Sequence, residues 1–265
     1  MTAAPVSPSI GVFDSGVGGL TVLRELHRQL PDVPLHYIAD AAYAPYGERS
    51  PAFLAERSTR LTQRLLDQGA RLIVIACNTA TAHAIQALRE RWPGLPIVGT
   101  EPGIKPAVAA SSNGRVGVLA TPATIASQRY RTLVHRHAGS AEVFSQPCPG
   151  LADLIERGNL QSPELAELIE QQCAPLREAG VDTVLMGCTH YPFVQTELQQ
   201  ALGPQVRLLN IETAVAQQAR RLWEALSIAP AQGGLQLATT GDAATLTRFA
   251  NQMLGWQVQA EAVVI

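Results

Sequence analysis

The chain has 265 residues, of which 46% are hydrophobic and 16% are charged, and its formal net charge is −2. This length and composition predict a well-buried core in one large or two smaller domains, and they exclude a disordered chain. No block of basic residues is present, so the charge gives no argument for binding nucleic acid or a membrane surface.

A few residues allow inferences about the cellular compartment and about which cofactors the protein could bind. The first nine residues lack the basic and apolar regions of a signal peptide, and no apolar run could span a membrane, so we expect a soluble cytoplasmic protein. Lys105 is the only lysine, and pyridoxal phosphate would depend on it alone for a Schiff base. The cysteines form no C-x-x-C pair, which leaves a zinc ribbon or thioredoxin-like motif unsupported and predicts free thiols.

Short, continuously apolar segments alternate with longer segments that carry apolar residues at three-to-four spacing. The short segments predict strands covered on both faces, and the longer ones predict amphipathic helices. The alternation predicts βαβ units and a doubly wound α/β fold with mainly parallel sheets. In chain order we expect strand 10–13, helix 21–29, strand 35–39, helix 51–68, strand 72–76, helix 79–91, strands 97–98 and 116–120, helices 127–137 and 163–179, strands 181–186 and 206–209, and helix 214–226.

The sequence also repeats weakly. LLDQGARLIVIACNTA (from Leu65) aligns with LREAGVDTVLMGCTHY (from Leu176), and IGVFDSG and LPIVGTE align with VGVLATP and VRLLNIE in the same order. We infer two similar α/β domains that divide near residues 99–103. Chance similarity between βαβ units is the alternative, but it does not explain why a cysteine, Cys77 or Cys188, ends the matching strand in both halves.

Both cysteines come where a predicted strand turns into a helix, the end at which open α/β sheets bind ligands. The N–H groups of a helix N-terminus favour a thiolate over a thiol. If the two domains face each other, one thiol can remove a proton from one face of a carbon while the other delivers a proton to the opposite face. Buried cysteines are often inert, but matched positions and polar followers favour the inversion of a stereocentre by Cys77 and Cys188.

The residues that follow the cysteines are Asn78 and Thr79 in the first half, and Thr189 and His190 in the second. With backbone N–H groups they could hold a carboxylate and stabilise the charge that develops on it. His190 could exchange a proton with Cys188, and Asp14, at the end of the first strand, could serve Cys77 in the same way. Alternatively, Asp14 or Ser15 is a helix N-cap.

A glycine-rich turn, residues 14–19, follows the first strand and suggests a nucleotide loop as a rival. The G-x-G-x-x-G pattern fails because Thr21 stands in place of the third glycine, and the Gly-Lys-Ser/Thr of a P-loop is missing. We expect the glycines to let the backbone approach a small anionic ligand. Residues 45–47, Pro-Tyr-Gly, form a turn after the second strand whose backbone could also contact a ligand.

Four motifs together resemble the glutamate racemases of bacteria: FDSGVGGLTV (from Phe13), PYGERS (from Pro45), ACNTATA (from Ala76) and GCTHYP (from Gly187). The resemblance extends from residue 10 to about residue 240. It implies interconversion of L- and D-glutamate without a metal or organic cofactor, supplying D-glutamate for peptidoglycan. Cys77 would act on D-glutamate and Cys188 on L-glutamate.

The same resemblance implies roles for the neighbouring residues. Asp14 and His190 would assist the two thiols, and Glu156 would support His190. The implied substrate contacts are Asp14, Ser15, Pro45, Tyr46, Gly47, Asn78, Thr79, Thr121, Thr189 and His190. The family architecture further implies a first domain of residues 1–99 plus 212–265 and a second of residues 100–211, related by a pseudo-twofold axis with the active site between them.

One segment of the sequence departs from the family pattern, and several questions about function stay open. Residues 210–212 read Asn-Ile-Glu where relatives often carry Asp and a small residue, which bears on the domain return. Cys148 and Cys173 are interpreted as structural. Alternatives are a superfamily relative that acts on aspartate, hydantoins or malonates, and a non-catalytic binding protein. The resemblance leaves a homodimer and a contact with DNA gyrase open, since some glutamate racemases inhibit gyrase.

Overall fold

The computed structural model describes residues 7–229 and 232–265. The chain folds as two compact units. The first contains the described residues up to Thr100 and those from Glu212 onward, and the second contains Glu101–Ile211. Each unit is built on its own sheet, and every strand pair in both sheets is parallel.

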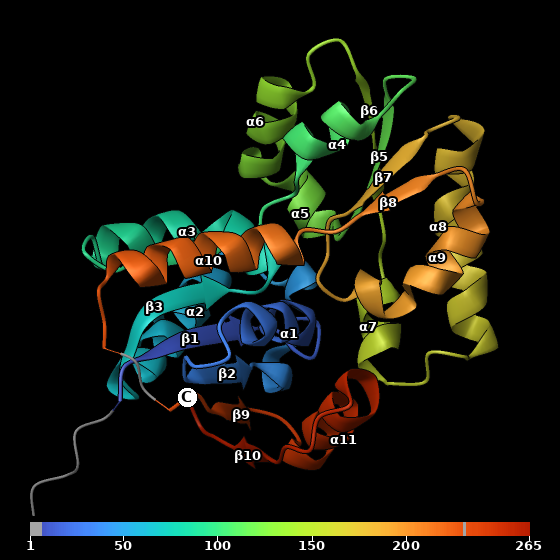
Figure 1. Cartoon of the computed structure of the whole chain (residues 1–265). Helices are drawn as coiled ribbons and strands as arrows, with labels where there is room; N and C mark the ends of the chain where they lie inside the picture. Colours follow the sequence, from blue (N-terminus) through green and yellow to red (C-terminus); the bar gives the residue numbers. More distant parts are fainter. Residues whose placement is uncertain (1–6, 230–231) are drawn as a thin grey trace, which may run out of the picture. The chain divides into compact units, whose positions relative to one another are not determined.

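The sheet of the first unit has the strand order β10-β9-β2-β1-β3-β4, so that the last two strands of the chain pair beside the second (Figure 1). Its elements are β1 (Ser9–Asp14), α1 (Leu20–Gln29), β2 (Leu35–Ala39), η1 (Ala41–Tyr43), η2 (Tyr46–Glu48), α2 (Pro51–Asp67), β3 (Ala70–Ile75), α3 (Asn78–Arg91), β4 (Ile97–Gly99), α10 (Glu212–Ala225), β9 (Leu235–Thr239), α11 (Ala243–Leu254) and β10 (Ala260–Ala262).

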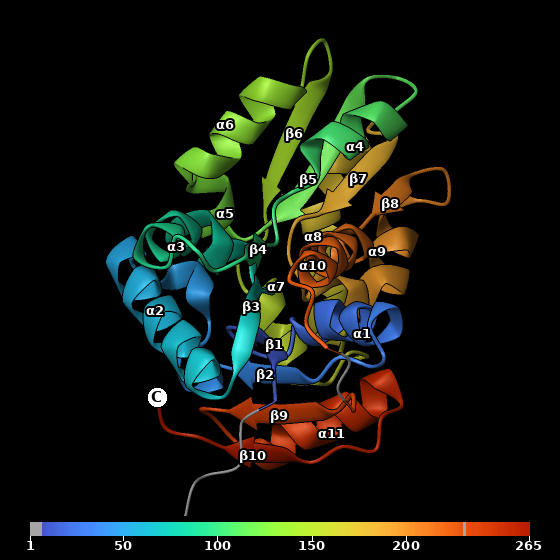
Figure 2. The ribbon, with the colours of Figure 1, turned by 60° about the vertical axis from the view of Figure 1, so that its left-hand side comes forward.

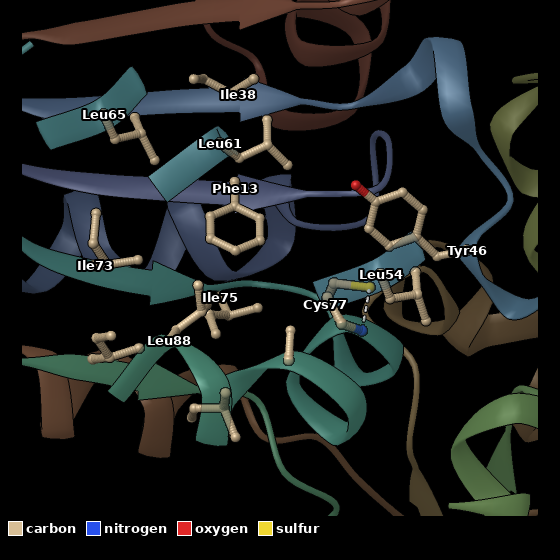
Figure 3. Packing of buried hydrophobic residues seen from close by; sticks show 14 of the residues in the cluster. Phe13, Ile38, Tyr46, Leu54, Leu61, Leu65, Ile73, Ile75, Cys77 and Leu88 are labelled. Atoms are coloured by element: carbon tan, nitrogen blue, oxygen red, sulfur yellow. Dashed lines mark hydrogen bonds between the residues drawn. The ribbon is translucent and has the colours of Figure 1, made fainter. Parts of the chain in front are cut away.

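Helices cover both faces of this sheet, with α2 and α3 on one face and α1 and α10 on the other (Figure 2). The apolar runs in β1 and β3 follow from this double cover, because both faces of each strand are buried apart from Arg71 near the start of β3. On the α2–α3 face, strand residues such as Phe13 and Ile75 pack against Leu61 and Leu88 (Figure 3). The α2 helix begins where Ser50 accepts the Phe53 N–H.

The second unit has a sheet of order β6-β5-β7-β8. Helices α4 and α6 pack on one face of it, and α8 and α9 pack together as a neighbouring pair. Its elements are α4 (Ile104–Ala110), β5 (Arg115–Ala120), α5 (Pro122–Ala126), α6 (Gln128–His137), β6 (Glu142–Pro147), α7 (Leu151–Glu156), α8 (Pro163–Glu178), β7 (Thr183–Met186), η3 (Tyr191–Val194), α9 (Gln195–Leu202) and β8 (Arg207–Leu209).

The predicted α/β class with parallel sheets is confirmed. The order β2-β1-β3-β4 in the first unit has the same form as β6-β5-β7-β8 in the second, as the weak sequence repeat leads one to expect. The prediction omitted three strands, β6, β9 and β10, and the helices α4, α5, α7, α9 and α11. Over the residues described, no helix has both the length and the apolar character that crossing a bilayer requires.

Candidate active site

Cys77 follows β3 and occupies the N-cap position of α3, as the sequence predicts for a thiol at a helix N-terminus. Its Sγ accepts the N–H of Ala80 at 3.4 Å, and the thiol lies 3.9 Å from Ser15 Oγ, to which it donates. The residue is buried. A sulfur held against free helix N–H groups is well placed to carry negative charge.

The Asp14 carboxylate accepts the N–H of Gly19 at 2.6 Å. Gly19 itself is the N-cap residue of α1, and no side chain caps this helix, so the alternative that Asp14 or Ser15 is the N-cap residue is wrong. A Cβ added at Gly19 would lie 2.6 Å from Asp14 Cβ and 2.9 Å from the Tyr37 hydroxyl. This glycine therefore lets the turn close tightly over Asp14.

Tyr46 lies beside Cys77 in the same buried cluster (Figure 3). Its hydroxyl donates to Asp40 Oδ2 at 2.6 Å. Burial raises the pKa of Tyr46 far above its usual range, and the negative charges of Asp40 and Cys77 raise it further, so the phenol remains a donor. Its neighbours Pro45 and Gly47 are half-buried, and the Ala44–Pro45 peptide is cis.

Both residues that follow Cys77 are buried. The Asn78 side-chain amide donates to the carbonyl of Thr100 at 3.1 Å, which holds this side chain against the end of β4. We define the Cys77 site as Asp14, Ser15, Pro45, Tyr46, Gly47, Cys77, Asn78 and Thr79, all of which belong to the first unit.

Cys188 lies two residues beyond the end of β7, the corresponding strand of the second unit, and it is also buried. Its Sγ lies 3.5 Å from His190 Nδ1, while His190 Nε2 lies 2.6 Å from Glu156 Oε1. Burial alone would lower the pKa of His190, but the Cys188 sulfur and the Glu156 carboxylate raise it well above its usual value of 6.5. The two neighbours of the His190 ring therefore favour its protonated form.

The segment after Cys188 corrects one expectation, because no α-helix begins there. The chain makes a turn in which the Tyr191 N–H donates to the Cys188 carbonyl, and the short η3 follows. Pro192 lies in η3, and α9 begins only at Gln195. The Cys188 sulfur thus has a histidine ring beside it, whereas the Cys77 sulfur lies at a helix N-terminus.

Two further predicted contacts lie in the second unit. Thr189 is buried. The hydroxyl of Thr121 accepts the Thr124 N–H at 3.2 Å and caps α5, so it has a structural role as well. We define the Cys188 site as Thr121, Glu156, Cys188, Thr189 and His190.

All four cysteines are free thiols. Burial raises the pKa of Cys148 and of Cys173 to about 12, and neither is placed to exchange protons near neutral pH. Lys105 is exposed on α4. Over residues 7–229 and 232–265, no three His, Cys, Asp or Glu side chains gather closely enough to hold a metal ion.

The sequence interpretation missed Asp40 and Arg57, which form a buried ion pair next to Tyr46. A signal existed, because Asp40 directly follows β2 just as Asp14 ends β1. It also did not single out Tyr191, although this residue lies in the GCTHYP motif and is fully buried.

Comparison with known proteins identifies the family. Residues 10–219 match the model of the Asp/Glu/Hydantoin racemase family. The chain is 49% identical over 222 residues to a glutamate racemase of Pseudomonas aeruginosa, covering 84% of each chain. The glutamate racemase isoform RacE1 of Bacillus anthracis has a TM-score of 0.89 at 31% identity, covering 98% of this chain and 99% of that one.

The Escherichia coli glutamate racemase, solved with L-glutamate and the activator UDP-MurNAc-ala, has a TM-score of 0.86 at 31% identity, over 98% and 99% of the two chains. The resemblance drawn from the four motifs is thereby confirmed. The chain belongs to the Asp/Glu/Hydantoin racemase family and is an enzyme of the racemase class.

Proposed function

We propose that this enzyme interconverts L- and D-glutamate by moving the α-proton between Cys77 and Cys188, without a cofactor. One observation carries the proposal: β3 and β7 hold the same place in their sheets. A buried cysteine lies two residues beyond the end of each strand, with a proton-handling or charge-stabilising group beside it. The identity to a curated glutamate racemase supports glutamate as the substrate.

The chemistry needs two groups because inversion removes a proton from one face and adds one to the other. With D-glutamate, the Cys77 thiolate takes the α-proton, and the proton shared by Cys188 Sγ and His190 Nδ1 is delivered to the opposite face. With L-glutamate the roles reverse. The scheme requires that the two sulfurs reach opposite faces of one α-carbon.

The α-proton of an amino acid is weakly acidic, so the two thiols alone are insufficient. General acid–base catalysis contributes about 10²–10⁴-fold, or roughly 3–5 kcal/mol, of an enhancement that corresponds to about 8–23 kcal/mol in enzymes. The remainder must come from groups that stabilise the enolate-like carboxylate and exclude water. Candidates are Ser15, Asn78, Thr79, Thr121 and Thr189.

The proposal extends to the setting of the reaction. We infer that the two compact units are the functional domains, that the enzyme works in the cytoplasm, and that its D-glutamate enters peptidoglycan. A homodimer and a contact with DNA gyrase remain predictions, which sedimentation of the purified protein and a supercoiling assay with the Cys77→Ser protein would test.

The decisive test is racemisation and α-proton exchange in deuterated water for Cys77→Ser and Cys188→Ser, measured from both enantiomers of glutamate. We expect both variants to lose racemisation by at least about 10³-fold, while the matched control Cys173→Ser retains it. Full activity in either of the first two variants would remove that cysteine from the mechanism. Aspartate in the same assay tests the substrate, and faster turnover of aspartate than of glutamate would contradict the proposal.

A further inference from the structure

A buried ion pair lies behind Tyr46 in the first unit. The Arg57 guanidinium donates to both oxygens of Asp40, from Nε at 3.0 Å and from Nη2 at 2.6 Å. Arg57 is 4% exposed and Asp40 is 0% exposed. A bidentate pair of this kind sets the orientation of both side chains, and removing one partner would leave an uncompensated buried charge.

The Asp40 carboxylate has two further donors. Oδ2 accepts the Tyr46 hydroxyl at 2.6 Å, and Oδ1 accepts the Thr240 hydroxyl at 3.0 Å. Each oxygen thus receives two hydrogen bonds, so the carboxylate is fully satisfied although it is buried. We call Asp40, Tyr46, Arg57 and Thr240 the Arg57 network.

The Tyr46 side chain connects the Arg57 network to the Cys77 site, because it belongs to both. The Tyr46 ring packs in the same cluster as Cys77 and Leu54, and the Cys77 charge is close enough to raise the pKa of the Tyr46 phenol (Figure 3). The hydroxyl bond to Asp40 holds this ring from its far end. A ring fixed at both ends keeps the turn at residues 45–47 in place beside the thiol.

The network also reaches the last residues of the chain. The third guanidinium nitrogen, Arg57 Nη1, donates to the carbonyl of Ile265 at 2.8 Å. The Val263 N–H donates to the Thr239 carbonyl, and the side chains of Val263 and Ile265 pack on the cluster that contains Cys77. The guanidinium plane lies over the Tyr43 ring, 3.9 Å from its centroid, which closes the network on that side.

We propose that Asp40 and Arg57 are positioning residues for the Cys77 half of the reaction, and that residues 263–265 complete their site. They act by holding Tyr46 beside Cys77, so that the α-carbon lies at the correct distance from that sulfur. Misplacement of a reacting group by about 1 Å can cost 10²-fold in rate. This inference rests on the proposed function, because it assigns the residues to one of its two proton transfers.

A double-mutant cycle tests whether Arg57 acts through Tyr46. Tyr46→Phe removes the hydroxyl and keeps the ring, and Arg57→Lys keeps the charge and removes the fork that binds Asp40 and Ile265. We expect each variant to lower kcat/KM for glutamate about tenfold, and the double variant to lower it no further. A double variant whose loss is the product of the two single losses would overturn the proposal.

A second readout separates positioning from a general loss of structure. The equilibrium constant between enantiomers is one, so kcat/KM must fall equally in both directions. The primary isotope effect is free of this constraint. It should rise with 2-deutero-D-glutamate, whose proton goes to Cys77, and not with 2-deutero-L-glutamate. Unchanged isotope effects in variants that have lost activity would contradict the assignment to Cys77.

Arg115→Lys is the matched control, because Arg115 forms an exposed ion pair with Glu142 in the second unit and should leave all kinetics unchanged. If Arg57→Lys does not fold, two milder variants remain. A chain that stops at Val263 removes the Ile265 acceptor together with the Ile265 side chain that packs on the cluster. Thr240→Val removes one Asp40 donor together with the acceptor of the Ala42 N–H. Both should show the same isotope pattern with a smaller loss. If the wild-type protein does not racemise glutamate, the proposed function is refuted. If the wild type is active but the losses of kcat/KM in Tyr46→Phe and Arg57→Lys multiply in the double variant, only this inference is refuted.

Discussion

The Cys77 site and the Cys188 site differ in how they surround the same kind of atom. Cys77 caps α3 and takes a backbone N–H, with Ser15 as its side-chain neighbour. Cys188 precedes a turn and has the His190 ring beside it, which the Glu156 carboxylate holds. Two strands at equivalent places in their sheets are therefore followed by thiols with unlike surroundings.

The difference matters because a helix end and an imidazolium are not interchangeable. The helix N-terminus presents a fixed partial charge of about half a unit, and it has no proton to give. His190, when protonated, carries a full charge and a proton that can move to the sulfur. The comparison teaches that the two proton transfers, equal in outcome, should respond unequally to mutation and to pH.

The largest expected difference is between His190→Asn and Ser15→Ala. The first removes the imidazolium beside Cys188 and should lower kcat by about 10²–10⁴-fold, the contribution typical of a general acid or base. The second removes one hydroxyl beside Cys77, whose backbone N–H partner remains, and should cost less than about tenfold. Steady-state racemisation measured by circular dichroism checks both, and equal losses would mean that the two surroundings are functionally equivalent.

A smaller effect is expected from Glu156→Gln, which tests the pH dependence of the Cys188 site. The Glu156 charge contributes to the raised pKa of His190, so its removal should lower that pKa. The alkaline limb of the kcat profile should then move to lower pH. If the alkaline limb of the kcat profile does not move, or moves to higher pH, a group other than His190 controls that limb.

The same pKa has a consequence for stability. Because the pKa of His190 is higher in the folded chain than its usual 6.5, the imidazolium interactions stabilise the fold fully below pH 6.5. This contribution is lost as the pH rises through the folded-state pKa. The melting temperatures of wild type and His190→Asn should therefore converge with rising pH.

Thiol labelling sharpens the comparison further. With iodoacetamide near pH 8, Cys77 and Cys188 should be modified and glutamate should protect both, while Cys148 and Cys173, with pKa values of about 12, stay unmodified. His190→Asn should slow labelling of Cys188 several-fold and leave Cys77 unchanged. Peptide mass spectrometry gives each rate, and equal slowing at both cysteines would contradict a local effect.

The smallest effect is expected from Asp182→Asn. Asp182 belongs to a polar cluster of the second unit that has no part in the cysteine chemistry. Asp182 accepts hydrogen bonds from Ser111, Ser112 and Asn113, which outweigh its burial and hold its pKa well below its usual 3.8. Its stabilising contribution is present above pH 3.8 and is lost as the pH falls through the folded-state value. The variant should melt about 3 °C lower at pH 7 with unchanged kinetics, and altered kinetics would show that this loop is coupled to the site.

The elements that the sequence predicts are those with strong local patterns. Strands β1, β2 and β3 are buried on both faces and read as apolar runs, and α2 has its Ser50–Pro51 start and three-to-four spacing. Strand β6 (EVFSQP) lies at a sheet edge and is only partly buried, so it shows no apolar run. Strand β10 has three residues, and its pairing with β9 decides its conformation more than its own composition does.

The residues of the candidate site also divide into those that a local sequence pattern marks and those that it does not. Cys77, Asp14 and Cys188 could be proposed as site residues because strand ends and the residues that follow them are local features, and Glu156 because it matches a family position. The contacts of the Arg57 network could not be predicted, although Tyr46 was named and Asp40 has a strand-end signal, since Arg57 meets Asp40 across 17 positions and Ile265 across 208. No local pattern encodes such a contact, and only the fold brings these residues together.

The pairing of β9 and β10 with the strands of the first unit also affects the order in which the two units can fold during synthesis. The second unit is continuous in sequence, so all of its strands have been synthesised once β8 leaves the ribosome. The first sheet must wait for residues 235–262, since β9 pairs with β2. At about 5–20 residues per second, the half that is translated first would thus be the last to finish folding. Its N-terminal strands would need protection from aggregation for roughly 10 seconds or longer.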